Sequence, residues 1–222
     1  LDTADAESCR KFEQSHKALI NKLAELKAEV DANETLKERI KRKYKIKNTT
    51  GYSLNALVDY AEPIDILKHL IIGSEGTLAF ISSITYNTVE DYKDKSLALI
   101  IYPNIKEACK AVQVLKQQPV SAVELIDRAG VRSVENTPGI PQYLKTISPA
   151  ATALLVETRA ANPAKLQEQV DIIKESIKDF TPELPFSFTT DTKKQAILWK
   201  IRKETLPTVA GMRKSGTTAI IE

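Results

Sequence analysis

Hydrophobic residues near the start of the chain recur at three- and four-residue steps, which is the spacing of one face of a helix. This pattern predicts a helix over residues 5–33, with Asp5 as its N-cap and Asn33 at its end. A second amphipathic helix is expected over residues 34–45. The apolar positions of the first helix are Leu19, Ile20, Leu23, Leu26 and Val30.

The next forty residues contain fewer periodic segments. Residues 48–55 lack periodicity and are predicted to form a loop. Pro63 suits the first turn of a helix, so a short helix is expected over residues 64–70. A glycine-punctuated turn follows at residues 71–76. The Ile, Thr, Phe and Tyr content of residues 78–89 then indicates a strand.

A polar, charged stretch at residues 89–96 marks an expected domain boundary, which predicts domains at residues 1–92 and 96–222. Beyond it, β-branched runs alternate with amphipathic segments, as in a layered α+β domain with helices packed on one face of a sheet. The predicted strands are residues 97–102, 120–125, 153–158, 186–189 and 217–221, and the predicted helices are residues 105–118, 126–136, 163–180 and 192–206.

Composition excludes several classes of protein. Hydrophobic residues make up 42% of the 222, which is enough for a core and excludes wholesale disorder. The net charge of +3 is too balanced for a dedicated nucleic-acid-binding protein. Cys9 and Cys109 form no paired motif, which excludes a disulfide framework and favours a reducing compartment. No apolar run approaches the ~20 residues of a membrane-spanning helix.

The two ends of the sequence suggest a piece of a longer polypeptide. No Met opens the chain, and Met212 is the only methionine. The chain stops at residues 217–222, a β-branched run that reads as a strand. We therefore expect a complete active site to need segments outside this chain.

Metal and nucleophile motifs are not found in the sequence. His16 and His69 stand at no ligand spacing from each other or from a cysteine. We expect His16 to be solvated and His69 to make a local hydrogen bond. No Gly-x-Ser-x-Gly elbow is present, and Ser74 has no activating base beside it in the sequence.

A basic run occupies residues 34–47, which contain seven basic and two acidic residues, a local excess of five positive charges. Such a helix can contact phosphates or an anionic membrane surface. A solvated face whose lysine stems cover apolar neighbours is favoured, because only Tyr44 is interleaved as an aromatic. The basic residues are Lys37, Arg39, Lys41, Arg42, Lys43, Lys45 and Lys47.

The sharpest local feature is the turn at residues 73–77, which holds two of the seven glycines. Glycine permits positive φ and close approach of the backbone to a ligand, and exposed amides in such a turn bind anions. The turn matches neither a dinucleotide-binding nor a Walker loop, so an ordinary turn remains an alternative. Arg202, on a later predicted helix, can hold a carboxylate with two parallel hydrogen bonds or be a simple surface arginine.

Residues 48–57 (NTTGYSLNAL) and 63–81 (PIDILKHLIIGSEGTLAFI) resemble the FAD-linked oxidases of the vanillyl-alcohol oxidase / p-cresol methylhydroxylase superfamily. Residues 1–5, 199–202 and 216–218 are similar to one subgroup, the bacterial D-2-hydroxy-acid dehydrogenases of the D-lactate or D-2-hydroxyglutarate type, which carry a C-terminal iron–sulfur region. The likeness covers essentially the whole chain and is strongest at residues 48–89.

The resemblance implies an α+β architecture in which residues 1–92 are the second half of an FAD-binding domain. Residues 96–222 would then be the first part of a substrate-binding cap, with helices on a mainly antiparallel sheet. Arg202 would face the substrate carboxylate, and no catalytic residue or metal ligand carries over to this chain. The implied flavin contacts are Gly51, Tyr52, Leu54, Gly73, Ser74, Glu75, Gly76, Thr77 and Ile81.

The reaction implied by the resemblance is oxidation of a D-2-hydroxy acid to the 2-oxo acid by hydride transfer to FAD. The resemblance also implies a cytoplasmic protein, or one peripheral to the inner membrane, without nucleic acid as a partner. It specifies neither the electron acceptor nor the oligomeric state, and the iron–sulfur cysteines would lie outside this chain. Many relatives have glycine at the position of Ala79, where alanine matches the subgroup, and an acidic residue at that of Ser83.

Two alternatives remain open. One is a non-enzymatic α+β interaction module that binds nucleic acid or an acidic partner through residues 34–47. The other keeps the FAD fold and changes the substrate to an aromatic alcohol or a sugar lactone, because substrate choice depends largely on the cap. In the enzyme interpretation, the chain alone is expected to be inactive.

Overall fold

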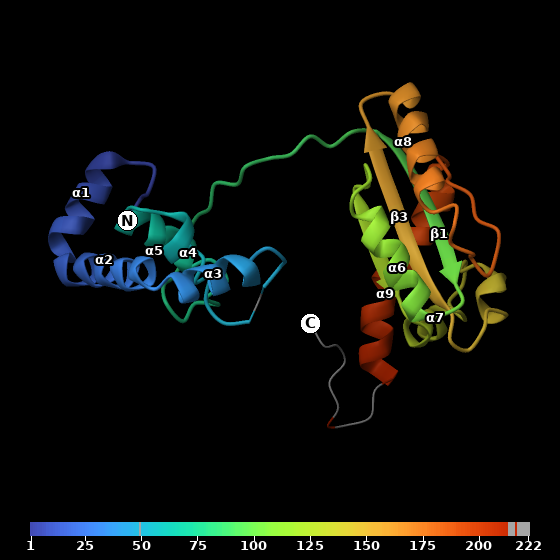
Figure 1. Cartoon of the computed structure of the whole chain (residues 1–222), viewed down its shortest axis with the longest axis horizontal. Coiled ribbons are helices and arrows are strands. Elements are labelled where there is room, and N and C mark those ends of the chain that lie inside the picture. Colours follow the sequence, from blue (N-terminus) through green and yellow to red (C-terminus); the bar gives the residue numbers. More distant parts are fainter. Residues whose placement is uncertain (49, 213–215, 217–222) are drawn as a thin grey trace. The chain divides into compact units, whose positions relative to one another are not determined.

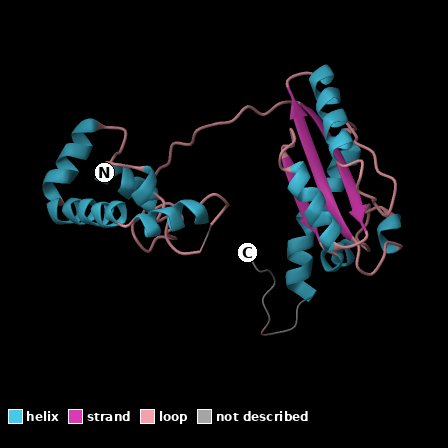
Figure 2. Cartoon of the chain, in the orientation of Figure 1, coloured by secondary structure: helices cyan, strands magenta, loops and turns pink. Residues whose placement is uncertain are grey.

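The computed structural model describes residues 1–48, 50–212 and 216. The chain forms two compact units, Leu1–Asn87 and Thr88–Glu222. The helices of the first unit and the sheet of the second are shown in Figures 1 and 2. The strand predicted at residues 217–221 lies outside the described residues.

The first unit is helical and consists of α1 (Ala6–Ser15), α2 (Lys17–Ala32), α3 (Glu34–Lys43), α4 (Ala56–Asp59) and α5 (Pro63–Leu70). Asp5 caps α1 by accepting hydrogen bonds from the amides of Glu7 and Ser8, as predicted. The single helix predicted over residues 5–33 is wrong, because the backbone leaves helical geometry at His16. Six buried residues form the core of this unit: Leu23, Val30, Ile40, Ala56, Leu57 and Ile66.

The strand predicted over residues 78–89 is also wrong. The structure describes all of these residues, and none of them belongs to a strand or ladder. Phe80 and Val89 are each 91% exposed, and Tyr86 is 77% exposed. A strand needs a neighbouring strand for its amides and carbonyls, and the described part of the chain offers this segment none.

The second unit is built on a three-stranded sheet of β1 (Asp94–Tyr102), β2 (Ala122–Ile126) and β3 (Thr152–Ala160), in the order β1-β3-β2. Both outer strands pair antiparallel with β3, so they run parallel to each other. The predicted α+β class and antiparallel sheet are therefore confirmed. The strand predicted at residues 186–189 is reduced to a single bridge between Leu97 and Thr189.

Helices cover both faces of this sheet, which corrects the expectation of helices on one face. One face packs on α6 (Ile105–Leu115) and α8 (Pro163–Ser176). The other packs on α7 (Arg128–Val134), α9 (Thr192–Met212) and a 3-10 turn at Gln142–Lys145. Every residue of β1 from position 96 to position 102 is buried, since the unbroken apolar run Leu97–Tyr102 places hydrophobic side chains on both faces.

Gly130 allows α7 to approach α9 closely. A Cβ atom at this position would lie 2.9 Å from Ile126 Cγ2 and 3.0 Å from Thr205 Cγ2, closer than packed carbon atoms come. At Gly211, near the end of α9, a Cβ atom would meet no described atom within 4 Å. The two helical glycines therefore make a matched pair for testing this packing.

We predict that Gly130→Ala lowers the free energy of unfolding by about 1–3 kcal/mol through overpacking, although alanine favours helix by about 1 kcal/mol. Gly211→Ala should leave it unchanged or raise it by less than about 1 kcal/mol. Urea unfolding followed by the fluorescence of Trp199, the single tryptophan, reports on this unit. Equal stability of Gly130→Ala and the parent would contradict the packing argument.

Tyr102, the last residue of β1, is fully buried in the core cluster that includes Ile173 of α8, and its ring is edge-on to that of Phe180 with 6.4 Å between the centroids. Its hydroxyl oxygen has no hydrogen-bond partner in the described part of the chain. Burial raises the pKa of this phenol to about 12. The fold thus holds Tyr102 neutral at a pH where the unfolded chain would ionise it.

We predict that Tyr102→Phe raises the free energy of unfolding by up to about 1 kcal/mol at pH 7, because it removes a buried unpaired hydroxyl. In the parent, the phenol ionises near pH 10 when unfolded and near pH 12 when folded, so its contribution is present below pH 10 and is lost as the pH rises towards 12. The free energy of unfolding, measured with urea at pH 9 and at pH 11, should fall less between these pH values in Tyr102→Phe than in the parent. The same loss in both proteins would reject this assignment.

Candidate functional site

The structure brings together two loops of the first unit, residues 50–54 and residues 72–77. The Tyr52 hydroxyl lies 3.0 Å from Thr77 Oγ1, and the Ser53 hydroxyl donates to the carbonyl of Ile72 at 2.9 Å. These loops belong to separate motifs, and Tyr52 and Thr77 are 25 positions apart in sequence. The predicted ligand contacts at Gly51, Tyr52 and Leu54 therefore lie beside those at residues 73–77.

Tyr44, which directly follows α3, holds the first of these loops. Its hydroxyl donates to the carbonyl of Tyr52 at 2.7 Å and accepts from the amide of Leu54 at 3.1 Å. A tyrosine hydroxyl can do both at once, so one side chain fixes two points of the loop backbone. The sequence analysis noted Tyr44 only as the one aromatic in the basic run and missed this role.

The turn at residues 73–77 has an unusual backbone, in which Ser74 is buried at 4% exposure and three of the other residues are exposed with free amides. Gly73, Glu75 and Gly76 have φ of 78°, 52° and 77°, the left-handed region that glycine enters without steric cost. The amides of Ser74 and Thr77 donate within the turn, to Ile71 and Ser74. The amides of Gly73, Glu75 and Gly76 have no acceptor among the described residues, and all three residues are exposed. The turn therefore presents three free donors to a ligand.

Exposed apolar side chains accompany these amides. Tyr52 and Leu54 belong to the neighbouring loop, and Ile81 follows the turn in the sequence. Tyr52 is 43% exposed and Leu54 is 45% exposed. Ile81, 38% exposed, lies four residues beyond the turn in the irregular segment, and no hydrogen bond among the described residues ties it to the turn. Free donors beside exposed apolar groups suit a ligand with a flat apolar body and a polar edge.

Arg202 lies on α9, in the second unit, where two carboxylates fasten this helix to the sheet. The Arg202 Nε donates to Glu124 Oε2 of β2 at 2.8 Å. One turn earlier, the Trp199 indole nitrogen donates to Glu157 Oε2 of β3 at 2.9 Å. The Trp-x-x-Arg motif is thus bound to adjacent strands through both of its named side chains.

Glu157 is 3% exposed, so its charge has to be compensated inside the unit. The Arg159 guanidinium donates to its other oxygen, and Arg159 also pairs with Asp91 at 2.8 Å. The hydrogen bond to Glu157 raises the pKa of Arg159, and the hydrogen bond from Lys95 lowers the pKa of Asp91. The buried carboxylate therefore keeps a permanently charged partner.

The sequence analysis did not single out Glu124 or Glu157 as site residues. A signal was present, because Glu124 interrupts the apolar strand AVELI and Glu157 directly follows the apolar run ALLV of TALLVETRA. Charged residues are almost never fully buried without a partner, so such an acid predicts a cation or donor opposite. Arg159 lies two residues further along the same strand and on the same face, so it could have been named from the sequence. Trp199, 42 positions away on another element, could not.

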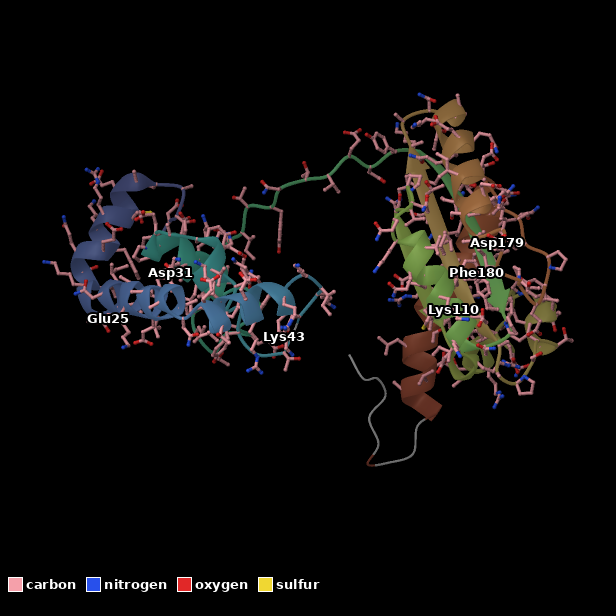
Figure 3. All side chains as sticks on the ribbon, viewed as in Figure 1. Glu25, Asp31, Lys43, Lys110, Asp179 and Phe180 are labelled. Carbon is pink, nitrogen blue, oxygen red and sulfur yellow. The ribbon has the colours of Figure 1, made fainter. Side chains whose placement is uncertain are left out.

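The basic run falls on α3 and the turn after it. Lys37 pairs with Asp31 at 3.3 Å and Lys41 with Glu38 at 2.7 Å. Lys43, labelled in Figure 3, and the remaining cations are exposed, without an ion pair among the described residues. Because the side chain of Tyr44, the one aromatic of the run, packs against the buried core of the unit, the run offers no fully exposed ring for stacking on bases. A solvated face remains the favoured interpretation.

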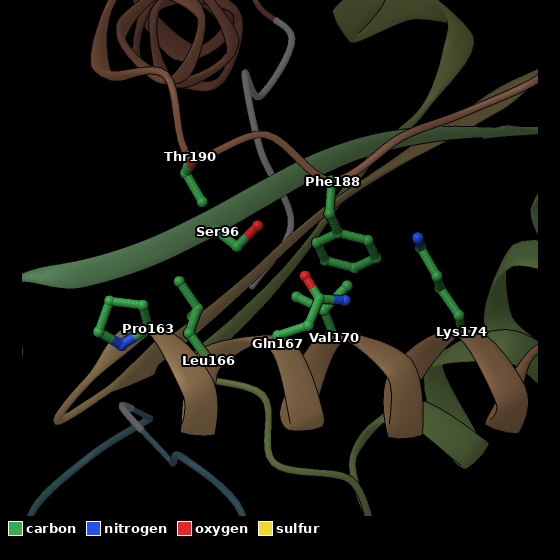
Figure 4. Close-up of a pocket in the computed structure, with 8 residues that line it drawn as sticks. All are labelled: Ser96, Pro163, Leu166, Gln167, Val170, Lys174, Phe188 and Thr190. Carbon is green, nitrogen blue, oxygen red and sulfur yellow. The ribbon is translucent and has the colours of Figure 1, made fainter.

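A cavity of about 300 Å³ lies between α8, β1 and the segment around Phe188 (Figure 4). It opens on the face of the sheet that packs on α8, whereas Arg202 lies on α9, which packs on the opposite face. The cavity and Arg202 are therefore separate features. Its lining residues are Ser96, Pro163, Leu166, Gln167, Val170, Lys174, Phe188 and Thr190.

Metal-ligating side chains do not cluster in the part of the chain that the structure describes. His69 stacks on Tyr60 with 3.7 Å between ring centroids, and its Nδ1 lies 2.7 Å from the carbonyl of Asp65, which confirms the local role predicted for it. His16 is exposed and stacks on Phe12.

No described helix is long and apolar enough to cross a membrane.

Comparison with known proteins adds the following. Residues 92–222 match the family described as FAD linked oxidases, C-terminal domain. The chain is 32% identical over 143 residues, 63% of its length, to the mitochondrial D-lactate dehydrogenase [cytochrome] of Arabidopsis thaliana. It is 30% identical over 95 residues, 42% of its length, to a D-lactate dehydrogenase of Archaeoglobus fulgidus. These matches span 24% and 18% of the two relatives.

Proposed function

The chain belongs to the FAD-linked oxidase family, and on that premise we propose that it is part of a flavoenzyme that oxidises a D-2-hydroxy acid to the 2-oxo acid. Both relatives reported above are named D-lactate dehydrogenases, which supports a small hydroxy acid as the substrate. In this reaction the α-carbon loses a hydride and the hydroxyl loses a proton. When bound, FAD accepts the hydride. The base that takes the proton is assigned to no residue of this chain.

Residues 1–92 are the C-terminal half of the FAD-binding domain in this proposal, and residues 96–222 are the N-terminal part of the substrate-binding cap. The observation that carries the flavin assignment is the exposed turn with free amides at Gly73, Glu75 and Gly76. The segment at residues 78–89 supports it as well, because its apolar side chains are largely exposed and it pairs with no strand in the described part of the chain, which leaves it available to the rest of such a domain.

The residues present fit one side of a flavin nucleotide. The three free amides are suited to donate to its polar atoms, and Ser74 and Thr77 hold the turn that aims them. The exposed side chains of Tyr52, Leu54 and Ile81 are available to cover its apolar surface, with Gly51 at positive φ in the neighbouring loop. These are half of a cradle, and the rest is assigned to segments outside the chain.

Arg202 binds the carboxylate of the hydroxy acid in this proposal and so orients the α-hydrogen. Its side chain is 42% exposed, and only its Nε is paired among the described residues. The two terminal nitrogens suit a carboxylate, which accepts two parallel hydrogen bonds from a guanidinium. Trp199 and Glu124 hold Arg202 on a helix that is fixed to the sheet.

The finer assignments rest on the likeness of residues 1–5 and 199–202 to the bacterial subgroup. One is that the complete protein carries a C-terminal iron–sulfur region. The other is that the protein is cytoplasmic, or peripheral to the inner membrane. A cluster takes four thiolate ligands, and this chain has two cysteines, so the cluster would be held elsewhere. The electron acceptor stays unassigned.

We predict that the purified 222-residue chain retains no FAD after gel filtration and does not oxidise D-lactate, because half of the cofactor cradle is missing. The complete protein should retain flavin, visible in its absorbance spectrum. Circular dichroism of the chain serves as the control that its helices have formed. Stoichiometric flavin on the isolated chain would contradict the division of the FAD-binding domain proposed above.

We predict that Arg202→Ala in the complete enzyme lowers kcat/KM for the hydroxy acid by about 100-fold or more, since two charge-assisted hydrogen bonds are lost. Lys203→Ala is the matched control, because it removes an exposed cation from the adjacent position of α9 and should change kcat/KM by less than about threefold. Steady-state kinetics measure both. Unchanged catalytic efficiency in Arg202→Ala would refute the substrate role.

A further inference from the structure

We propose that Glu124 is a positioning residue that aims the guanidinium of Arg202 at the substrate. The inference rests on the proposed function, in which Arg202 binds the substrate carboxylate. Glu124 belongs to β2, and nothing in the family match or in the names of the relatives assigns it a role.

The contact between the two side chains determines which edge of the guanidinium is open. Glu124 Oε2 accepts from Arg202 Nε at 2.8 Å, and neither terminal nitrogen of Arg202 donates to Glu124. The guanidinium is planar and its five donors have fixed directions, so holding Nε sets the direction of the opposite edge. That edge carries the two terminal nitrogens, which have no partner within residues 1–48, 50–212 and 216.

A second carboxylate sets the rotation of α9. Glu124 pairs with Leu155 across the ladder and Ala122 pairs with Glu157, so the two acids lie on one face of adjacent strands, displaced by two residues. Two residues along a strand span about 6.7 Å, and three residues along a helix rise about 4.5 Å. Trp199 and Arg202 have that helical spacing and meet Glu157 and Glu124 respectively. The helix is therefore held at two points, and of these only the contact of Arg202 with Glu124 leaves donors free, the two terminal nitrogens, among the described residues.

Another arginine of the same unit shows the contrast with a structural ion pair. Arg128 gives a terminal nitrogen, Nη1, to Glu135 at 2.8 Å, and both side chains are mostly buried, at 11% and 15% exposure. Arg202 and Glu124 are 42% and 36% exposed. Glu124 thus occupies the one nitrogen that a carboxylate approaching the terminal edge does not need, at a site that solvent and small anions can reach.

This arrangement separates orientation from charge. Glu124 offsets the positive charge of Arg202, which weakens attraction for the substrate anion, while its oxygen fixes the direction of the donors. Glu124→Gln keeps an oxygen acceptor and removes the charge, whereas Glu124→Ala removes both. The two variants therefore have different expected kinetics if Glu124 positions Arg202.

The test measures kcat and KM of the complete flavoenzyme with D-lactate. We expect Glu124→Ala to lower kcat at least tenfold without raising KM, because the substrate still binds but is oriented less well. Glu124→Gln should keep kcat within about threefold of the parent and lower KM, because an acceptor remains and the repulsive charge is gone. Equal kcat values for these two variants, whether both unchanged or both reduced, would overturn the proposal. Flavin absorbance identifies the folded holoenzyme in each preparation.

Glu135→Ala is the matched control, because it also removes a carboxylate from an arginine of this unit. It should lower the melting temperature and leave the ratio of kcat to KM close to that of the parent. Arg202→Ala separates the two hypotheses. If Arg202→Ala retains full activity, the substrate clamp is wrong and the positioning role falls with it. If Arg202→Ala is impaired while Glu124→Ala is not, only the positioning role is rejected.

Discussion

The buried carboxylate of Glu157 constrains much of the second unit. A charge at 3% exposure is tolerated only with partners that satisfy both oxygens, and here Trp199 and Arg159 do so. The hydrogen bond from Trp199 fixes the rotation of α9 about its own axis against the sheet. Arg159 connects β3 to Asp91, which lies just before β1. The placement of Arg202 follows from this, since it lies one turn beyond Trp199 on the same helix.

The first unit depends on a different kind of constraint, the backbone of one turn. Positive φ at Gly73 and Gly76 directs amides outward, and the link between Tyr52 and Thr77 places a second loop beside them. The hydrogen bonds that join the two loops use no charged side chain. This is compatible with recognition of a cofactor through main-chain donors, and it explains why the basic run on α3 is not needed for the proposed function.

The errors of the sequence analysis have identifiable physical causes. Residues 78–89 have the composition of a strand, but a strand forms only when another strand satisfies its backbone, and none is present in the described part of the chain. The run Leu97–Tyr102 forms the predicted strand, and its unbroken hydrophobicity is the feature that requires packing on both faces of the sheet. The break at His16 carries no strong helix-stop signal, such as glycine or proline, in the sequence.

Local chemistry was readable from the sequence alone: the cap at Asp5, the helix break at Asn33, the proline that begins α5, the glycine turn, and the segments that resemble a flavoenzyme family. Each depends on residues within a few positions of one another. The partners of Arg202, Trp199 and Tyr44 were decided only by the tertiary structure. Arg202 and Trp199 meet carboxylates 78 and 42 positions away, and a linear pattern carries no register between strands and helices that distant.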